Sequence, residues 1–212
     1  MKGILKMQRS YLYLHKNGIA LSKIEAGDLA LLMDHLNTTW YGRHSWAAVN
    51  MLNQQDWFEK VSRDATQFIV MAFDNGTSLK EKCDPLTPVG LYKLRNIDLI
   101  NRCADSAHDV FKIAQGLGYG HLVLQAGIDA AFEMFGLNRL NTEVLANNIA
   151  SQKTAIKAGY TEEGVKRKAI LKCGERIDSI CYGLLYEDWK KLDRVLCFKG
   201  CSNKSYVPKE RK

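Results

Sequence analysis

The chain has 212 residues, a formal net charge of +7, 46% hydrophobic residues and 25% charged residues. These are the values of an ordinary globular protein, long enough for one domain with a buried core. The sequence contains no apolar run of 18 residues, and its basic N-terminus lacks the apolar stretch of a signal peptide. We therefore expect a cytoplasmic protein without a membrane partner, either a monomer or a homodimer.

Cysteine spacing and charge distribution narrow the class of protein further. The six cysteines are too few and too scattered for a disulfide scaffold, and no C-x-x-C pair with a nearby histidine predicts a metal site. Residues 190–212 carry eight basic and two acidic side chains, which is +6 of the net +7. We expect a domain over 1–190 and a basic, solvated tail over 191–212. Nucleic acid is a less favoured partner for that tail.

In the first half of the chain, one or two strands are predicted between Tyr11 and Glu25, broken at Asn17-Gly18. A first amphipathic helix follows Asp28, with its apolar side chains at helical spacing: Leu29, Leu32, Met33 and Leu36. A second helix is predicted around residues 49–61, and a buried strand from Gln67 to Phe73.

The second half alternates strands with two helices. Val89–Ile97 and Ala104–Ile113 are predicted to form an antiparallel pair. A helix opens at about His121 and ends at Gly136, and a second one runs from Asn148 to Gly159. The remaining strands are expected at Arg139–Leu145, Lys166–Lys172 and Arg176–Leu185. This order predicts a mixed α/β sheet in one layered domain.

The turn Gln115-Gly116-Leu117-Gly118-Tyr119-Gly120 stands between a predicted strand and a predicted helix. Such a turn offers unpaired backbone N–H groups and the positive end of the helix dipole, which suits a phosphate or diphosphate. A P-loop would need Lys-Ser/Thr after the last glycine, where this chain has His121-Leu122. The glycine spacing does not fit a dinucleotide fingerprint either.

The turn resembles the coenzyme A loop, Q/R-x-x-G-x-G/A, of the GNAT N-acetyltransferase family. The order of elements also fits that family, and the resemblance covers residues 18–190. Further motifs resemble its ribosomal-protein alanine acetyltransferase-like branch: Asn148–Ser151, Ala158-Gly159-Tyr160, Cys173–Asp178 and Tyr186–Trp189. The resemblance implies a single-domain GNAT fold, a mixed and mostly antiparallel sheet flanked by helices. It also implies an enzyme that transfers an acetyl group from acetyl-CoA to a primary amine.

By this resemblance, acetyl-CoA is held mainly by main-chain groups. The N–H groups of the glycine turn would bind the diphosphate, and a strand N–H around Phe111–Ile113 would polarise the thioester carbonyl. Asn148 is either a helix N-cap or a contact of the pantetheine arm. The expected cofactor-binding residues are Phe111, Ile113, Gln115, Gly116, Leu117, Gly118, Tyr119, Gly120 and Asn148.

Two catalytic side chains are expected from the same resemblance. Glu143 lies five residues before Asn148, where several family members carry the glutamate that takes the amine proton. Asp105 and His108 on the preceding strand are the competing base. The family's thiolate-protonating tyrosine is replaced by Ala155, so Ser151 is the candidate acid, or else only a first-turn serine.

The acceptor pocket is expected between the first two helices and the final hairpin. The predicted acceptor-binding residues are Trp40, Tyr41, Arg43, His44, Trp46 and His108. Aromatic faces and an arginine would suit a nucleotide-linked amino sugar, a nucleobase or a protein N-terminus; ordinary packing of two tryptophans would explain them as well. The alternative function is a GNAT-fold enzyme or module acting on, or bound to, nucleic acid through the basic tail.

Overall fold

The structure is a computed structural model that describes residues 9–38, 49–75, 87–172 and 174–192. The predicted acceptor segment 40–46 and nearly all of the predicted basic tail lie outside these residues. Within the described ranges, none of the helices is long and apolar enough to span a membrane.

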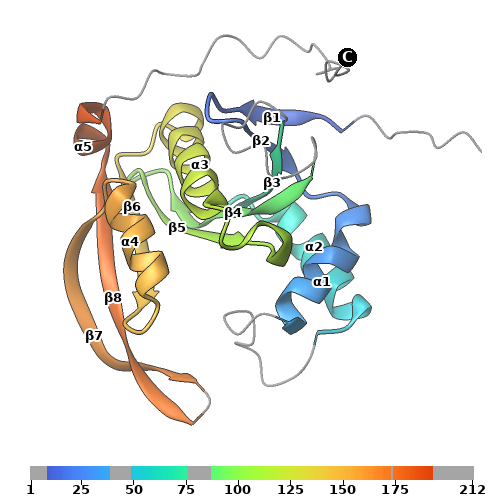
Figure 1. Cartoon of the computed structure of the whole chain (residues 1–212). Coiled ribbons are helices and arrows are strands. Elements are labelled where there is room, and N and C mark those ends of the chain that lie inside the picture. The colour runs from blue at the N-terminus through green and yellow to red at the C-terminus, as the bar shows by residue number, and fades with distance from the viewer. Residues whose placement is uncertain (1–8, 39–48, 76–86, 173, 193–212) are drawn as a thin grey trace, which may run out of the picture.

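Eight strands form one sheet in the order β1-β2-β3-β4-β5-β6-β8-β7 (Figure 1). Their bounds are β1 Tyr11–Leu14, β2 Ile19–Lys23, β3 Phe68–Asp74, β4 Pro88–Asp98, β5 Cys103–Val110, β6 Arg139–Leu145, β7 Thr161–Lys172 and β8 Glu175–Leu185. Only β5 and β6 pair in parallel, and every other neighbouring pair in this sheet is antiparallel.

The α-helices of the described chain are α1 Leu29–Thr38, α2 Met51–Arg63, α3 Tyr119–Phe135, α4 Ile149–Lys157 and α5 Tyr186–Lys191. Two short 3-10 helices, η1 Ala26–Asp28 and η2 Lys112–Ala114, precede α1 and follow β5. The predicted order of strands and helices is therefore confirmed.

Several local details differ from the sequence expectation. β7 begins at Thr161 rather than at Lys166. β5 ends at Val110 rather than Ile113, because Lys112–Ala114 already form a 3-10 turn. Helix α3 begins at Tyr119, two residues before His121, because Gly118 in the left-handed region (φ +87°) is its N-cap. Helix α5, after β8, was not predicted.

The sheet has an apolar core on each face, as the alternation along β3 illustrates. Val70 and Ala72 belong to the core beneath α3 and α4, whereas Ile69 and Met71 belong to the core beneath α1 and α2. Figure 1 shows α1 and α2 together at one end of the molecule, and α3 and α4 nearer the β7–β8 hairpin. This arrangement leaves the junction of β5 and β6 between the two groups of helices.

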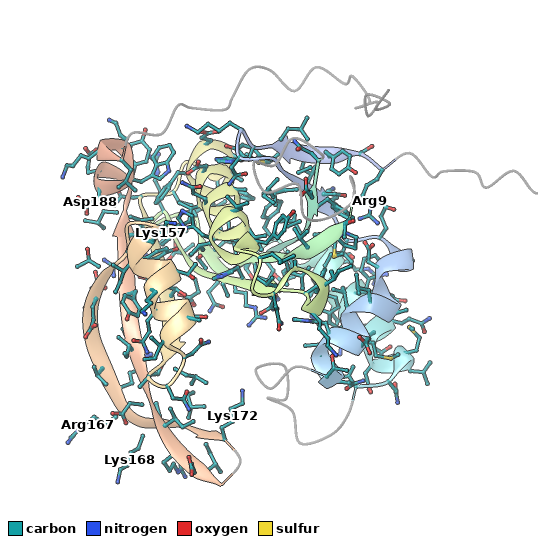
Figure 2. All side chains as sticks on the ribbon, viewed as in Figure 1. Arg9, Lys157, Arg167, Lys168, Lys172 and Asp188 are labelled. Carbon is teal, nitrogen blue, oxygen red and sulfur yellow. The ribbon has the colours of Figure 1, made fainter. Side chains whose placement is uncertain are left out.

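The β7–β8 hairpin extends beyond the rest of the sheet (Figure 1). A bulge interrupts its pairing, because Lys166 faces Ser179 while Ile170 faces Ile177. Figure 2 shows Arg167 and Lys168, which lie in the bulge, on the outer side of the hairpin and Lys172 on its inner side.

Candidate active site

The centre of the site is the point where β5 and β6 separate. The two strands pair in parallel only from Cys103 to Asp105, with Asp105 opposite Asn141. Beyond this point β5 continues beside β4 alone, and β6 continues beside β8 alone. Over residues 106–110, the edge of β5 that faces β6 therefore has no strand partner in the described part of the chain.

The hydrogen bonds at the end of β5 identify which main-chain groups face this opening. The Phe111 N–H donates to the Val89 carbonyl at 3.0 Å, so it points toward β4 and is already bonded. Because main-chain groups alternate in direction along a strand, those of His108 and Val110 point the other way. The Gln115 side chain donates to the Val110 carbonyl at 3.0 Å, in agreement with that direction. The N–H groups that point away from β4 at this end of β5 are therefore those of His108 and Val110 rather than that of Phe111, and Ile113 lies in the 3-10 turn.

The 17-residue helix α3 follows this open edge after the η2 helix and the glycine turn. Gly116 and Gly118 have φ of +72° and +87°, a conformation that L side chains rarely adopt. The amides of Gln115 and Leu117 close turns on Lys112 and Ala114, at 3.3 and 3.4 Å. The glycine amides and the first turn of α3 are then the donors that the turn offers to an anion.

Tyr119 contributes to the site through its main chain only. Its side chain is fully buried, and its hydroxyl donates to the Asp74 carboxylate in the core. This pair anchors the start of α3 to the end of β3. The first turn of the helix is thus held at a fixed place relative to the sheet.

Helix α4, which follows β6, carries two of the predicted site residues at its N-terminus, Asn148 and Ser151. The Asn148 side chain accepts a hydrogen bond from the Ser151 N–H at 3.2 Å, so its N-cap interpretation is confirmed. Ala155, at the family's tyrosine position, is buried. A different phenol, that of Tyr160, donates to the Ser106 hydroxyl at 2.9 Å. Ser106 directly follows Asp105, the last residue of β5 that pairs with β6.

Glu143 lies on β6 beyond the point of separation, and both of its carboxylate oxygens have partners. One oxygen forms an ion pair with Lys166, and the other accepts a hydrogen bond from the Ser179 hydroxyl at 3.1 Å. The ion pair is half-exposed, with 46% of the Glu143 side chain accessible. The glutamate raises the pKa of Lys166 through its hydrogen bond and its charge. The position suits an orienting carboxylate as well as a base.

The competing base of Asp105 and His108 does not form a unit. Residues three apart on a strand face opposite sides of the sheet. Asp105 accepts hydrogen bonds from Asn96 and Asn141, at 2.8 and 3.4 Å. His108 instead lies under the start of α3, where a Cβ at Gly120 would be 3.7 Å from its Nε2. Burial lowers the pKa of His108 to about 4, so its ring is neutral at pH 7.

Sequence reasoning missed a cluster of charged groups on the α1 side of β5. Asp109 forms an ion pair with Lys93 on β4, and its carboxylate oxygen Oδ2 is 3.8 Å from Nε2 of His35 on α1. His35 is buried and its ring packs edge-on against Phe111, with centroids 5.1 Å apart. The spacing of His35 could have indicated its burial, because it follows Leu29 and Leu32 at intervals of three residues on the buried face of α1.

A cleft of about 460 Å³ opens beside this cluster. Its walls come from α1, the start of β4 and the turn after β5, and its lining residues are Leu31, Asp34, His35, Thr38, Thr87, Pro88, Phe111, Lys112 and Ile113. Phe111 and Ile113, which were predicted to contact the cofactor, thus line a pocket on the side of the sheet that faces α1.

Residues 19–161 match the family model of the acetyltransferase (GNAT) domain. The chain belongs to the GNAT acetyltransferase family. This membership confirms the family to which the glycine turn and the order of elements pointed.

Two relatives from Bacillus subtilis (strain 168) are similar in sequence. YdaF, which carries the name "Putative ribosomal N-acetyltransferase", is 30% identical over 101 residues, which is 48% of this chain and 55% of that protein. The aligned region thus spans only about half of YdaF. YokL, an SPbeta prophage-derived protein named as an uncharacterized N-acetyltransferase, is 25% identical over 139 residues, or 65% of this chain and 72% of that protein.

The fold is also similar to a solved structure, the spermidine N-acetyltransferase from Vibrio cholerae in complex with CoA and spermine. The TM-score is 0.72 at 18% identity, over 82% of this chain and 98% of that one. This likeness confirms the GNAT fold.

Proposed function

We propose that this chain is a cytoplasmic enzyme that transfers an acetyl group from acetyl-CoA to a primary amine. One observation carries the proposal: the open edge of β5 leads directly into a glycine turn at the N-terminus of α3. A linear arm ending in a diphosphate matches that arrangement, because a strand edge binds extended chains and a helix N-terminus binds anions. The relatives described above all carry N-acetyltransferase in their names, which supports the same reaction class.

Main-chain groups hold the cofactor in this proposal. The amides of Gly116, Gly118 and the first turn of α3 bind the diphosphate, and the Asn148 side chain adds a contact to the arm. Bound acetyl-CoA supplies the thioester, whose carbonyl carbon is the acetyl donor. The N–H of His108 or Val110 polarises that carbonyl, and one such donor is typically worth about 2.7–4 kcal/mol in the transition state.

Glu143 and Ser151 are the proposed side chains around the reacting atoms. Continuing the β5–β6 register would set Glu143 opposite Ala107, across the opening. Because Lys166 and Ser179 already hold both oxygens, we assign Glu143 to orienting the acceptor ammonium. Ser151, in the first turn of α4, is assigned to protonating the departing thiolate.

The acceptor class is the open part of the proposal. The names of the relatives point in two directions, to the ribosome for YdaF and to spermidine for the Vibrio cholerae enzyme. The test incubates the full chain with acetyl-CoA and a panel of polyamines, monoamines and N-terminal peptides. Free thiol and the acetylated product are measured together, and we expect one thiol for each acetylated amine. If the protein binds acetyl-CoA in calorimetry but releases no thiol with any amine, the proposed N-acetyltransferase activity is wrong.

A further inference from the structure

The cleft beside α1 is largely apolar, and it lies next to the end of β5, the strand that would carry the thioester, because Phe111 in its lining directly follows that strand. Leu31, Pro88, Phe111 and Ile113 supply its apolar surface. The charged groups in its lining are Asp34 and Lys112, which have opposite signs. A cleft of about 460 Å³ is of the size that binds small molecules.

His35 links this cleft to the charges on the sheet. It lines the cleft, and its Nε2 is 3.8 Å from the Asp109 carboxylate, which is itself paired with Lys93. The Lys93–Asp109 pair is mostly buried, with side chains 14% and 28% accessible. A histidine oriented by a carboxylate is the arrangement that catalytic bases use, and its hydrogen bond is often long before substrate binds.

We propose that the cleft binds the apolar group of the acceptor amine and that His35, positioned by Asp109 and Lys93, accepts the proton of its ammonium. This inference rests on the proposed N-acetyltransferase function. It assigns the proton acceptor to α1 instead of to Glu143, and it identifies the acceptor as a monoamine with an apolar group.

The protonation states of the cluster support this assignment. Burial lowers the pKa of His35, and Lys93 lowers it further, while Asp109 and Asp34 oppose them. Burial alone would raise the pKa of Asp109, but the Lys93 ammonium, with smaller contributions from His35 and His108, keeps it below the usual value. At pH 7 the cluster therefore holds a neutral imidazole, a carboxylate and an ammonium. The imidazole of His35 is positioned to take up a proton, and Asp34 and Lys112 are the further charged groups among the described lining residues.

The proton and electron balance of the step is complete without another reactant. One proton moves from the acceptor ammonium to His35 and then to water. The neutral nitrogen uses its lone pair to form the bond to the thioester carbonyl carbon, and the carbon–sulfur bond breaks with its electron pair on sulfur. The nitrogen then loses its second proton, which replaces the one that Ser151 passes to the sulfur, so the sulfur is released as the thiol.

The same lining argues against a polyamine as the acceptor. A polycation needs several carboxylates to replace its water, and among the lining residues that the structure describes Asp34 is the sole acid, accompanied by the cation Lys112. An aromatic or branched aliphatic group instead gains from contact with Phe111, Ile113 and Leu31. Full burial of such a group changes binding by about 10- to 100-fold.

The first test compares His35→Gln and His35→Ala with the wild-type chain, at saturating acetyl-CoA and acceptor. Removing a general base typically lowers the rate by about 10²–10⁴-fold, so we expect kcat at pH 7 to fall by that factor in both variants. Acetyl-CoA affinity in calorimetry should stay unchanged. Wild-type kcat should rise with pH through an ionisation below 6.5, the ordinary histidine value, and His35→Gln should lose that limb. Added imidazole should restore activity to His35→Ala and leave Glu143→Gln unimproved.

The second test compares 2-phenylethylamine with ethylamine, and both with spermidine. We expect kcat/KM to be about 10- to 100-fold higher for the phenyl compound than for ethylamine, with spermidine no better than ethylamine. Wild-type kcat that does not change with pH between 5 and 7 would overturn the role of His35 without any variant. His35 variants with wild-type kcat would also overturn the role of His35. A preference for spermidine over 2-phenylethylamine would overturn the proposed acceptor class. If wild type acetylates no amine at all, the underlying function fails instead.

Discussion

The ring of Tyr92 occupies the space that a side chain at Gly127 would need. A Cβ built at Gly127 would lie 2.1 Å from Cγ and Cδ2 of Tyr92, well inside van der Waals contact. Helix α3 thus lies so close to β4 that only glycine fits at this position. Tyr92 is fully buried, and its hydroxyl is 3.3 Å from the Ser106 hydroxyl beside the opening of β5.

Gly127→Ala is therefore expected to destabilise the fold although alanine is the better helix former. Overpacking of a filled core costs about 1–3 kcal/mol, more than the helix-propensity gain of about 1 kcal/mol at most. Urea unfolding measures the loss. The matched control is Gly27→Ala in η1, where a Cβ meets nothing within 4 Å and a change below about 0.5 kcal/mol is expected. Equal stabilities of the two variants would contradict this account of the α3–β4 contact.

A buried carboxylate joins three parts of the chain on the other side of α3. Asp129 accepts hydrogen bonds from the Trp189 indole of α5 and from His15 after β1, each at 2.7 Å. The Asn17 N–H donates to the His15 Nδ1 at 3.1 Å, so Nε2 carries the proton that faces Asp129. Because Asp129 is 2% exposed, water cannot replace a lost donor.

We expect Trp189→Phe to cost about 1–3 kcal/mol, because it removes the indole hydrogen bond from a buried carboxylate. Tyr186→Phe on the same helix is the control, since the Tyr186 hydroxyl makes no hydrogen bond among the described residues. Chemical unfolding of both variants makes the comparison. A loss of similar size in both would show that α5 is held by apolar packing rather than by Asp129.

Local patterns in the sequence predicted most of the fold and the location of the glycine turn. Glycines and apolar periodicity are properties of neighbouring residues, which is why Gly118, Gly136 and the strand Arg139–Leu145 could be placed. Contacts between distant residues could not be placed in this way. Lys166 on β7 reaches Glu143 on β6 across β8, a strand order that the local sequence does not reveal. Tyr119 likewise reaches Asp74, which is 45 residues away in the chain.

The missed histidine has the same physical explanation. Helical spacing predicted that Leu29, Leu32, Met33 and Leu36 would face the core, but the buried residues of α1 are Leu29, Leu32 and His35. The helix is rotated toward His35, where Asp109 offers a polar neighbour at 3.8 Å. That neighbour depends on the position of α1 over β5, which the spacing of residues does not determine.

The glycine turn can be tested by a pair of isosteric substitutions at Gly118. Asparagine and aspartate are the residues that best tolerate the left-handed conformation found there, at φ +87°. Gly118→Asp adds a negative charge that Gly118→Asn lacks. If the turn binds a diphosphate, acetyl-CoA affinity in calorimetry should be about tenfold or more weaker in the aspartate variant than in the asparagine variant. Equal acetyl-CoA affinities of the two variants would show that the glycine turn does not bind the diphosphate.

His108 gives the protein a specific sensitivity to acid. Its pKa is lowered by burial from 6.5 to about 4, so the unfolded chain binds a proton in this pH window that the folded chain does not. Stability due to this group is therefore complete above pH 6.5 and is lost as the pH falls toward 4. Each pH unit in the window costs about 1.4 kcal/mol, and the whole window, 6.5 minus 4, costs about 3 kcal/mol.

His108→Gln removes the titrating ring, so its free energy of unfolding should change less between pH 7 and pH 4.5 than that of the wild type. The expected difference is about 2–3 kcal/mol, measured by urea unfolding at each pH. Asp109 does not produce the same signature, because its lowered pKa makes stability fall only below the ordinary aspartate value of 3.8. His35 contributes in the same direction as His108, so the variant should retain part of the dependence. Identical pH profiles for the variant and the wild type would mean that His108 is solvated and titrates normally.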